Sequence, residues 1–184
     1  MNVRFATAGM LGSGGRFATA LFVLALSAGV AHAQRRSGLK FSGAIGLSAP
    51  IGDLDKRGST GFGAAIRTES QLDADIWSLR GDFSFDRFGG KDGVDSYQYF
   101  TVATNLVHHT NVRLYQFGGF GIYTAKTAVD AVNNRSESAF GLQGGIGLNL
   151  DTKSLKSFVE FGITDVLTTG RSSVWFPVRV GIRL

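Results

Sequence analysis

The chain contains no cysteine and only two prolines among its 184 residues. The lack of cysteine excludes a disulfide framework, a thiol nucleophile and lipid attachment to an N-terminal cysteine. After residue 30 no segment is both long and continuously apolar, so a helical membrane span, which needs roughly twenty apolar residues, is excluded there. The abundant residues are instead glycine (26) and phenylalanine (15), which favour narrow, strongly bent sheets over a helical bundle.

Residues 1–33 have the pattern of a cleaved signal peptide. Arg4 and Arg16 supply positive charge, residues 20–30 are apolar, and Ala31-His32-Ala33 forms a cleavage site with small residues. We therefore expect export by the general secretory route, a mature chain beginning at Gln34 and one domain over residues 34–184. Met10 is an alternative start, and a retained membrane anchor is the alternative reading, although its apolar run is shorter than a span needs.

The charge balance gives no indication of a nucleic-acid partner. The formal net charge is +5, and removal of Arg4 and Arg16 with the signal peptide leaves +3. Lysine and arginine alternate with aspartate and glutamate along the chain instead of forming a basic patch.

Alternation of apolar and small or polar residues is the main structural signal, and it is clearest over residues 174–184. There the sequence V-W-F-P-V-R-V-G-I-R-L puts Val174, Phe176, Val178, Val180, Ile182 and Leu184 on one strand face. Similar segments of roughly ten residues recur, the length a tilted strand needs to cross a membrane. They cover residues 39–48, 62–69, 77–86, 99–106, 112–125, 140–150 and 155–164.

The fold class predicted from these segments is all-β, an up-and-down antiparallel transmembrane barrel of about eight strands. Long polar connections are expected after the first, third and fifth strands and one of intermediate length after the seventh, as in barrels with long outer loops and short periplasmic turns. These predicted outer loops are residues 50–60, 87–96, 126–138 and 165–173. In the fifth strand the apolar residues change phase at Gly118-Gly119, which we interpret as the site of a bulge, and Phe158 is out of pattern in the seventh.

The second face of these strands is predicted to line the barrel interior. It is rich in glycine, alanine and serine with isolated charges, which suits the narrow lumen of an eight-stranded barrel. The predicted interior charges form either an ion-pair and water network or a gated polar path. They are Lys40, Arg67, Glu69, Arg80, Asp82, Asp86, Lys156, Glu160 and Arg179. The amphipathic aromatics are expected at the two membrane interfaces. They are Trp77, Tyr97, Tyr99, Tyr123 and Trp175.

The signal peptide and the amphipathic strands form a pattern that resembles the small outer-membrane β-barrel family. Two segments complete it, Q-F-G-G-F-G at residues 116–121 and F-P-V-R-V-G-I-R-L at residues 176–184. The chain looks like the group of OmpA transmembrane domains, OmpX and OmpW. The resemblance implies contact with outer-membrane lipid and recognition by the outer-membrane assembly machinery through Phe176, Val178, Val180, Ile182 and Leu184. The family usually ends in phenylalanine, so the terminal leucine is a mild departure, and we expect no peptidoglycan-binding domain, unlike full-length OmpA proteins.

Residues that could carry catalysis or bind metal are few. His108 and His109 lie in a predicted periplasmic turn, and adjacent histidines on a strand point to opposite faces, so they form no metal pair. Asp53, Asp55, Asp92 and Asp95 lie in predicted outer loops and are expected to be solvated. We expect no cofactor, no bound metal and no enzymatic activity.

The predicted protein is a monomer in the outer membrane of a diderm bacterium, with a structural or surface-interaction role carried by its outer loops. A narrow porin-like channel for small solutes is the alternative. A secreted soluble, lipocalin-like ligand-binding barrel is the less favoured alternative, and it would require the phenylalanine-rich row to face inward.

Overall fold

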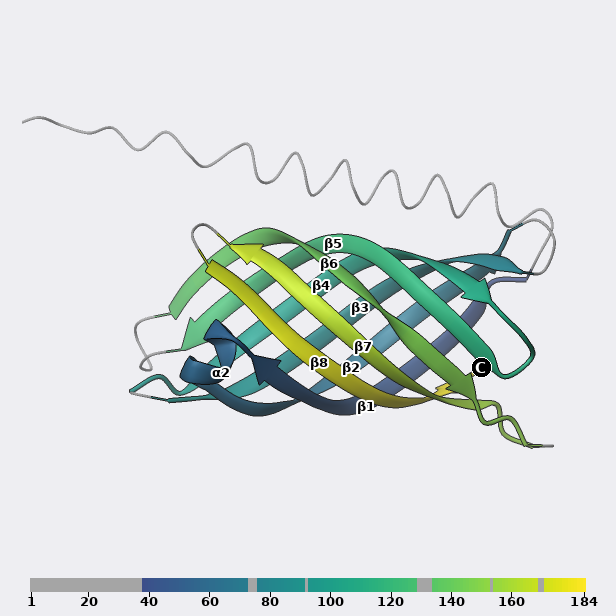
Figure 1. Cartoon of the computed structure of the whole chain (residues 1–184), viewed down its shortest axis with the longest axis horizontal. Helices are drawn as coiled ribbons and strands as arrows, with labels where there is room; N and C mark the ends of the chain where they lie inside the picture. Colours follow the sequence, from purple (N-terminus) through teal and green to yellow (C-terminus); the bar gives the residue numbers. More distant parts are fainter. Residues whose placement is uncertain (1–37, 73–75, 92, 129–133, 153, 169–170) are drawn as a thin grey trace, which may run out of the picture.

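The computed structural model describes residues 38–72, 76–91, 93–128, 134–152, 154–168 and 171–184. The predicted signal peptide lies outside the described residues. Eight strands form one closed barrel in which each strand pairs with the next and the first pairs with the last (Figure 1). The strands are β1 (Lys40–Ile51), β2 (Gly58–Gln71), β3 (Trp77–Gly90), β4 (Ser96–His109), β5 (Leu114–Ala128), β6 (Asn134–Asn149), β7 (Ser157–Thr168) and β8 (Arg171–Arg183).

All eight pairings are antiparallel, including the β1–β8 ladder that closes the barrel. The predicted up-and-down barrel of about eight antiparallel strands is therefore confirmed. Among the described residues no helix is long and apolar enough to cross a membrane. The short helix α2 (Asp53–Arg57) lies between β1 and β2, at the end of the barrel opposite the C-terminus (Figure 1). We call this the outer end and the opposite end the turn end.

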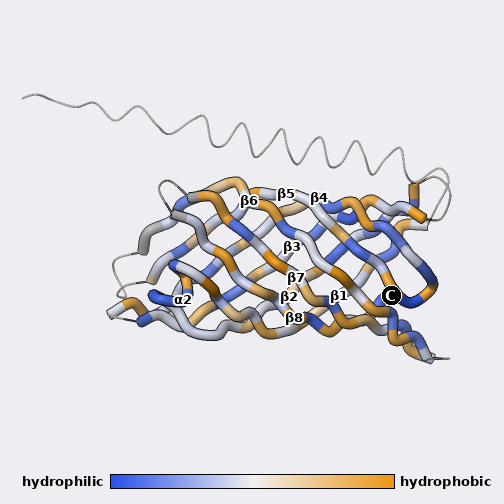
Figure 2. The backbone as a smooth tube through the Cα atoms, in the orientation of Figure 1, coloured by the Kyte–Doolittle hydropathy of each residue, from blue (hydrophilic) through white to orange (hydrophobic). Residues whose placement is uncertain are grey.

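The apolar rows of the strands face outward. Ile45, Ile66 and Phe83 are 71%, 66% and 60% exposed, although each lies in the middle of a strand. Figure 2 shows hydrophobic and hydrophilic residues alternating along the strands, as expected when one face meets lipid and the other lines the lumen. A soluble, lipocalin-like barrel would require this apolar row to face inward. That alternative prediction is therefore wrong.

The connections at the outer end are shorter than the sequence predicted. The β3–β4, β5–β6 and β7–β8 connections cover residues 91–95, 129–133 and 169–170, whereas the turn end has residues 72–76, 110–113 and 150–156. The two ends therefore do not differ as long loops and short turns would. The physical reason is that strand ends beyond the lipid need no apolar row, so the alternation of apolar residues is lost there. Backbone pairing nevertheless continues, for example from Ala125↔Glu137 to Ala128↔Asn134.

The predicted bulge in β5 is absent. Pairing with β4 and with β6 runs in one register through Gly118 and Gly119. Tyr115 and Phe117 face the lumen, whereas Phe120 and Ile122 are exposed on the outside. The apolar residues therefore change faces along a regular strand, because the lumen also accepts aromatic side chains.

Candidate functional site in the barrel interior

A cluster of buried charges fills the middle of the lumen. Glu160 on β7 lies between Arg67 on β2 and Arg80 on β3, with carboxylate-to-guanidinium distances of 2.7 and 2.8 Å. Asp82 on β3 lies 3.5 Å from Arg67 Nε and 3.1 Å from Arg80 Nε through its Oδ1 atom. These side chains are about 3–4% exposed, so the pairs span the lumen with little screening by solvent.

Neutral side chains add hydrogen bonds to the two carboxylates. Tyr115 Oη donates to Glu160 Oε1 at 2.8 Å. Asn105 Nδ2 and Gln143 Nε2 donate to Asp82 Oδ2 at 2.9 and 3.1 Å, and Gln143 also donates to Asn105 Oδ1 at 3.0 Å. These contacts join strands β3, β4 and β6, so one network crosses the barrel. Buried charges require hydrogen bonds of this kind to offset the loss of water.

A second ion pair lies nearer the outer end. Arg179 Nη2 on β8 donates to both oxygens of Asp86 on β3, at 2.7 and 3.0 Å, and Ser48 Oγ on β1 donates to Asp86 Oδ1 at 2.8 Å. With the central cluster this makes three guanidinium groups paired with three carboxylates in one network. The interior network is therefore charge-balanced.

Two aromatic rings pack against the guanidinium groups. The Arg80 guanidinium carbon lies 4.2 Å from the centre of the Phe117 ring, and Arg67 lies 5.3 Å from the centre of the Phe158 ring. Phe158, which did not fit the outward pattern, is 1% exposed and faces inward. Cation–π contacts of this kind stabilise desolvated arginine.

The structure brings six of the nine predicted interior charges into this network. They are Arg67, Arg80, Asp82, Asp86, Glu160 and Arg179. Lys40 and Lys156 are exposed, so their interior placement is wrong. Lys40 is the first residue of β1 and Lys156 precedes β7, so both lie at the turn end, where the alternation no longer decides what a side chain faces.

Glu69, the remaining predicted charge, lies inside the turn end in a separate polar cluster. Ser78 Oγ donates to Glu69 Oε1 at 2.7 Å and contacts His109 Nε2 at 2.7 Å, and the same histidine nitrogen lies 3.2 Å from Glu69 Oε1. Serine and glutamate therefore meet the same imidazole nitrogen. In a hydrolytic triad the acidic residue binds the other nitrogen, so this cluster lacks that geometry.

His109 is only about a quarter exposed and is not the solvated turn residue that the sequence predicted. The preceding His108 packs on the outside against Trp77, with ring centroids 4.5 Å apart. The two histidines point to opposite faces as expected, and no group of three or more metal-ligating side chains occurs among the described residues.

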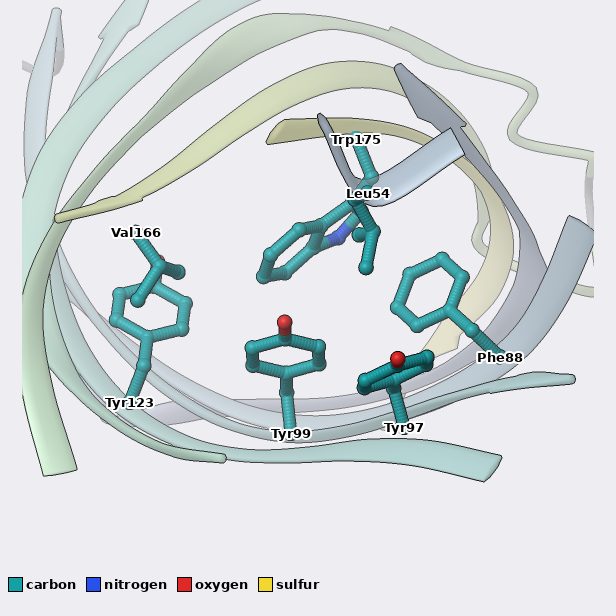
Figure 3. Packing of buried hydrophobic residues seen from close by; sticks show 7 residues of the cluster. All are labelled: Leu54, Phe88, Tyr97, Tyr99, Tyr123, Val166 and Trp175. Carbon is teal, nitrogen blue, oxygen red and sulfur yellow. The ribbon is translucent and has the colours of Figure 1, made fainter. Parts of the chain in front are cut away.

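An aromatic cluster closes the lumen at the outer end. It comprises Leu54, Phe88, Tyr97, Tyr99, Tyr123, Val166 and Trp175, all nearly or fully buried (Figure 3). The Trp175 ring is central, with centroids 4.8 Å from Tyr99, 5.6 Å from Phe88 and 6.1 Å from Tyr123. Tyr123 Oη donates to Gln143 Oε1 at 2.9 Å, so the aromatic cluster is joined to the ionic network.

This cluster corrects the prediction that the amphipathic aromatics form two interfacial belts. Only Trp77, which is 42% exposed, lies on the outer surface; Tyr97, Tyr99, Tyr123 and Trp175 face inward. Their positions in the alternation are those of the lumen row, as Trp175 shares its face with Arg179. Strand parity decides the direction of these side chains, and their amphipathic character does not override it.

Helix α2 covers the aromatic cluster through Leu54, which is fully buried. The β3–β4 connection holds the helix, because Lys91 N donates to Arg57 O at 2.8 Å and Lys91 Nζ donates to Asp55 O at 2.6 Å. Gly52, with φ of 62°, provides the left-handed turn into the helix. Asp53 and Asp55 belong to α2 and not to a loop, Asp95 is exposed, and Asp92 lies outside the described residues.

Sequence reasoning missed the neutral partners of the network. They are Ser48, Asn105, Tyr115, Phe117, Gln143 and Phe158. Their strand parity was a usable signal, because each falls on the lumen face of its strand. No local signal gives the pairings, since Arg179 and Asp86 are 93 positions apart.

An eight-stranded barrel with an apolar exterior and a filled polar interior defines the class of small outer-membrane β-barrel proteins. The family described as "Putative MetA-pathway of phenol degradation" matches residues 8–173, and the chain belongs to this family. A comparison with curated protein sequences found no match.

Solved structures agree with the class. Ail, the attachment invasion locus protein of Yersinia pestis, is 18% identical with a TM-score of 0.59, and the match covers 79% of this chain and 98% of that chain. Neisserial surface protein A is 12% identical with a TM-score of 0.56, covering 80% of this chain and 97% of that chain. At these identities the likeness shows the fold, and it confirms the resemblance to small outer-membrane barrels.

Proposed function

We propose that the protein is a closed, monomeric barrel of the outer membrane of a diderm bacterium, without cofactor or enzymatic activity, with a structural or surface-interaction role at its outer end. The observation that carries this proposal is the filled lumen. Six balanced charges pair across the barrel and an aromatic cluster covers them. A barrel filled in this way leaves its outer surface and its ends for function.

The membrane location is supported by the exposed apolar rows. A continuous apolar exterior of this kind is unfavourable in water and suits lipid. The outward row of β8, together with the following Leu184, keeps the alternation proposed as the signal for the assembly machinery, with exposures of 41–87%. Its members are Phe176, Val178, Val180, Ile182 and Leu184.

The role at the outer end is supported by the anchored helix α2. Leu54 buries the helix against the aromatic cluster, and Lys91 holds it through a hydrogen bond to Asp55 O. Lys56 is 76% exposed and lies 2.9 Å from the exposed Asp53, so its ammonium group can be reached by a surface partner. Charged groups on a rigid scaffold suit recognition.

Two measurements test this proposal. Outer-membrane fractions run on a gel with and without boiling should show a heat-dependent shift in migration, as a closed membrane barrel predicts. Cells carrying Lys56→Glu should then lose a surface phenotype, such as adhesion, without losing that shift. Recovery in the soluble fraction would contradict the location, and unchanged adhesion in both Lys56→Glu and a null strain would contradict the surface role.

A narrow path for small solutes is the second candidate function. The observation in its favour is a cavity beside the central cluster, together with the family's description, which names phenol degradation. Planar bilayers separate the two candidates. The closed-barrel proposal predicts no steady conductance for the unmodified protein, whereas a permanently open path would give one.

A further inference from the structure

The outward face of the barrel changes from apolar to polar near the outer end of three neighbouring strands. On β3, β4 and β5 the outward row ends there in a long polar side chain. These side chains are Arg87, Gln98 and Lys126. Phe85 and Phe100 occupy the preceding outward positions of β3 and β4, nearer the middle of the barrel. The two cations therefore lie where the wall leaves the hydrocarbon layer and meets lipid head groups.

The three polar side chains stand in one row across the sheet. Arg87 pairs with Gln98, and Gln98 pairs with Lys126. Because neighbouring strands lie about 4.8 Å apart, the backbones of Arg87 and Lys126 are separated by roughly 10 Å. Both side chains are exposed and long enough to bend toward each other, so their cationic ends can reach one group placed over β4.

Neither cation has a carboxylate partner within the described part of the chain. Asp86, the neighbour of Arg87 in sequence, faces the lumen and is bound there by Arg179. Lys126 Nζ lies 5.0 Å from the centre of the Phe100 ring, which leaves its charge uncompensated by an anion. Since Phe100 is on β4, the Lys126 side chain leans across β4 toward the strand that carries Arg87. The two positive charges thus converge on the same part of the outer wall.

A pair of aromatic rings adjoins the two cations on the membrane side. Phe85 and Phe100 face each other across β3 and β4, with ring centroids 4.9 Å apart. The wall therefore offers positive charge toward the outer end and an apolar surface directly below it. This is the order of groups along an anionic lipid, in which a charged head group is followed by hydrocarbon chains.

We propose that Arg87 and Lys126 together bind the phosphate group of an outer-leaflet lipid, whose acyl chains lie along Phe85 and Phe100. A phosphate monoester presents three acceptor oxygens, so a guanidinium and an ammonium group can bind it at once from two sides. The inference rests on the membrane location and on the outer end proposed above. It goes beyond them because it assigns a ligand to one place on the barrel wall.

The test uses the full-length barrel in phosphatidylcholine nanodiscs that contain increasing amounts of lipid A, a glycolipid with phosphate monoester groups. The ³¹P NMR signals of lipid A report its binding. We expect a saturable shift of these signals that neither oleic acid, an anionic lipid without phosphate, nor inorganic phosphate abolishes at equal concentration. Absence of saturable binding overturns the proposal. Displacement by oleic acid would show that only charge is recognised, and displacement by inorganic phosphate would show that the lipid is not; either result also overturns it.

Charge-matched variants locate the site on the wall. We expect Arg87→Gln and Lys126→Gln each to weaken lipid A binding about fivefold, and the double variant about twenty-five-fold, since one basic side chain at a membrane surface contributes about this much. The control is the double variant Arg113→Gln with Lys156→Gln, which removes two exposed cations from the turn end. It should leave the affinity unchanged. Equal affinity of the two double variants refutes the site.

Lys126→Arg provides a second, independent variant because it keeps the positive charge. It should retain the affinity that Lys126→Gln loses, and an equal loss in both variants would contradict the role of the charge. Each variant is first checked for the heat-dependent gel shift, so a folding defect is recognised. An unmodified barrel that shows this shift but binds no lipid A refutes the lipid site alone, whereas absence of the shift contradicts the membrane barrel, so the two proposals fail separately.

Discussion

Substitution of Glu160 by glutamine tests whether the interior network stabilises the barrel through balanced charge. The carboxylate binds Arg67 at 2.7 Å and Arg80 at 2.8 Å and accepts a hydrogen bond from Tyr115 at 2.8 Å. Breaking a buried ion pair by removing one partner costs about 3–5 kcal/mol. Glutamine keeps one acceptor oxygen, so we expect a loss near the lower end, about 3 kcal/mol in the free energy of unfolding.

The assay is urea unfolding of the barrel in lipid vesicles, followed by tryptophan fluorescence, which reports the buried Trp175 together with Trp77 on the outer surface. Lys56→Met is the matched control, since it also removes one charge but from an exposed pair, and its effect should stay within about 0.5 kcal/mol. A double variant, Glu160→Gln with Arg67→Met, removes one charge of each sign and should cost about 1–2 kcal/mol less than the sum of the single variants. Equal stability of Glu160→Gln and Lys56→Met would refute the reasoning, and strict additivity would refute the coupling.

Three further substitutions probe the packing, the closed outer end and the lipid face. In Gly147→Ala the new Cβ would lie 2.1 Å from Tyr115 Cζ, so we expect about 1–3 kcal/mol of destabilisation in the same urea assay, while Gly118→Ala should be neutral. Trp175→Ala removes the centre of the aromatic cluster and should cost about 3–5 kcal/mol in urea unfolding followed by circular dichroism; a fully stable variant would contradict the packing that closes the outer end. Ile45→Arg places a charge on the exposed apolar row and should lower stability in lipid by about 2–4 kcal/mol, whereas no effect in vesicles would argue that this row does not meet lipid.

The strands were predictable because the alternation of apolar and polar residues depends only on residues that are close in sequence. Residues 174–184 show it without interruption, and the structure pairs them along both edges of β8. The lumen row followed from the same parity. Six of nine charges lie in the network because parity holds in the middle of a strand, and it failed for Lys40 and Lys156 because each lies where a strand begins.

The direction of the aromatic side chains was predictable in principle but was interpreted wrongly. Tyr99 and Trp175 stand on the glycine- and charge-bearing face, yet their amphipathic rings suggested an interface. The bulge at Gly118-Gly119 was inferred from the assumption that apolar residues must face lipid. A lumen that packs Phe117 on Arg80 removes the need for it.

The pairings themselves could not be predicted, because they depend on the three-dimensional closure of the barrel. Arg179 meets Asp86 across the lumen, and Gln143 meets both Asp82 and Asn105. The interruption of the β7–β8 ladder at Pro177 was also beyond sequence reasoning. Proline lacks a backbone N–H, but only the arrangement of the strands puts Pro177 opposite Gly162.

The β1–β8 ladder has a consequence for the order in which the molecule folds. Each of the other seven ladders joins consecutive strands, so it can form as a hairpin while the chain emerges, whereas Ile45 must wait for Val180 near the far terminus. Contacts of such wide sequence separation form slowly, because a large loop entropy is lost before any pairing is gained. Until then β1 exposes an unpaired edge, the feature that makes folding intermediates prone to aggregate. The rate-limiting event of folding is therefore expected to be the pairing of β8 with β1. A chain truncated before β8 should accumulate as an aggregation-prone open sheet.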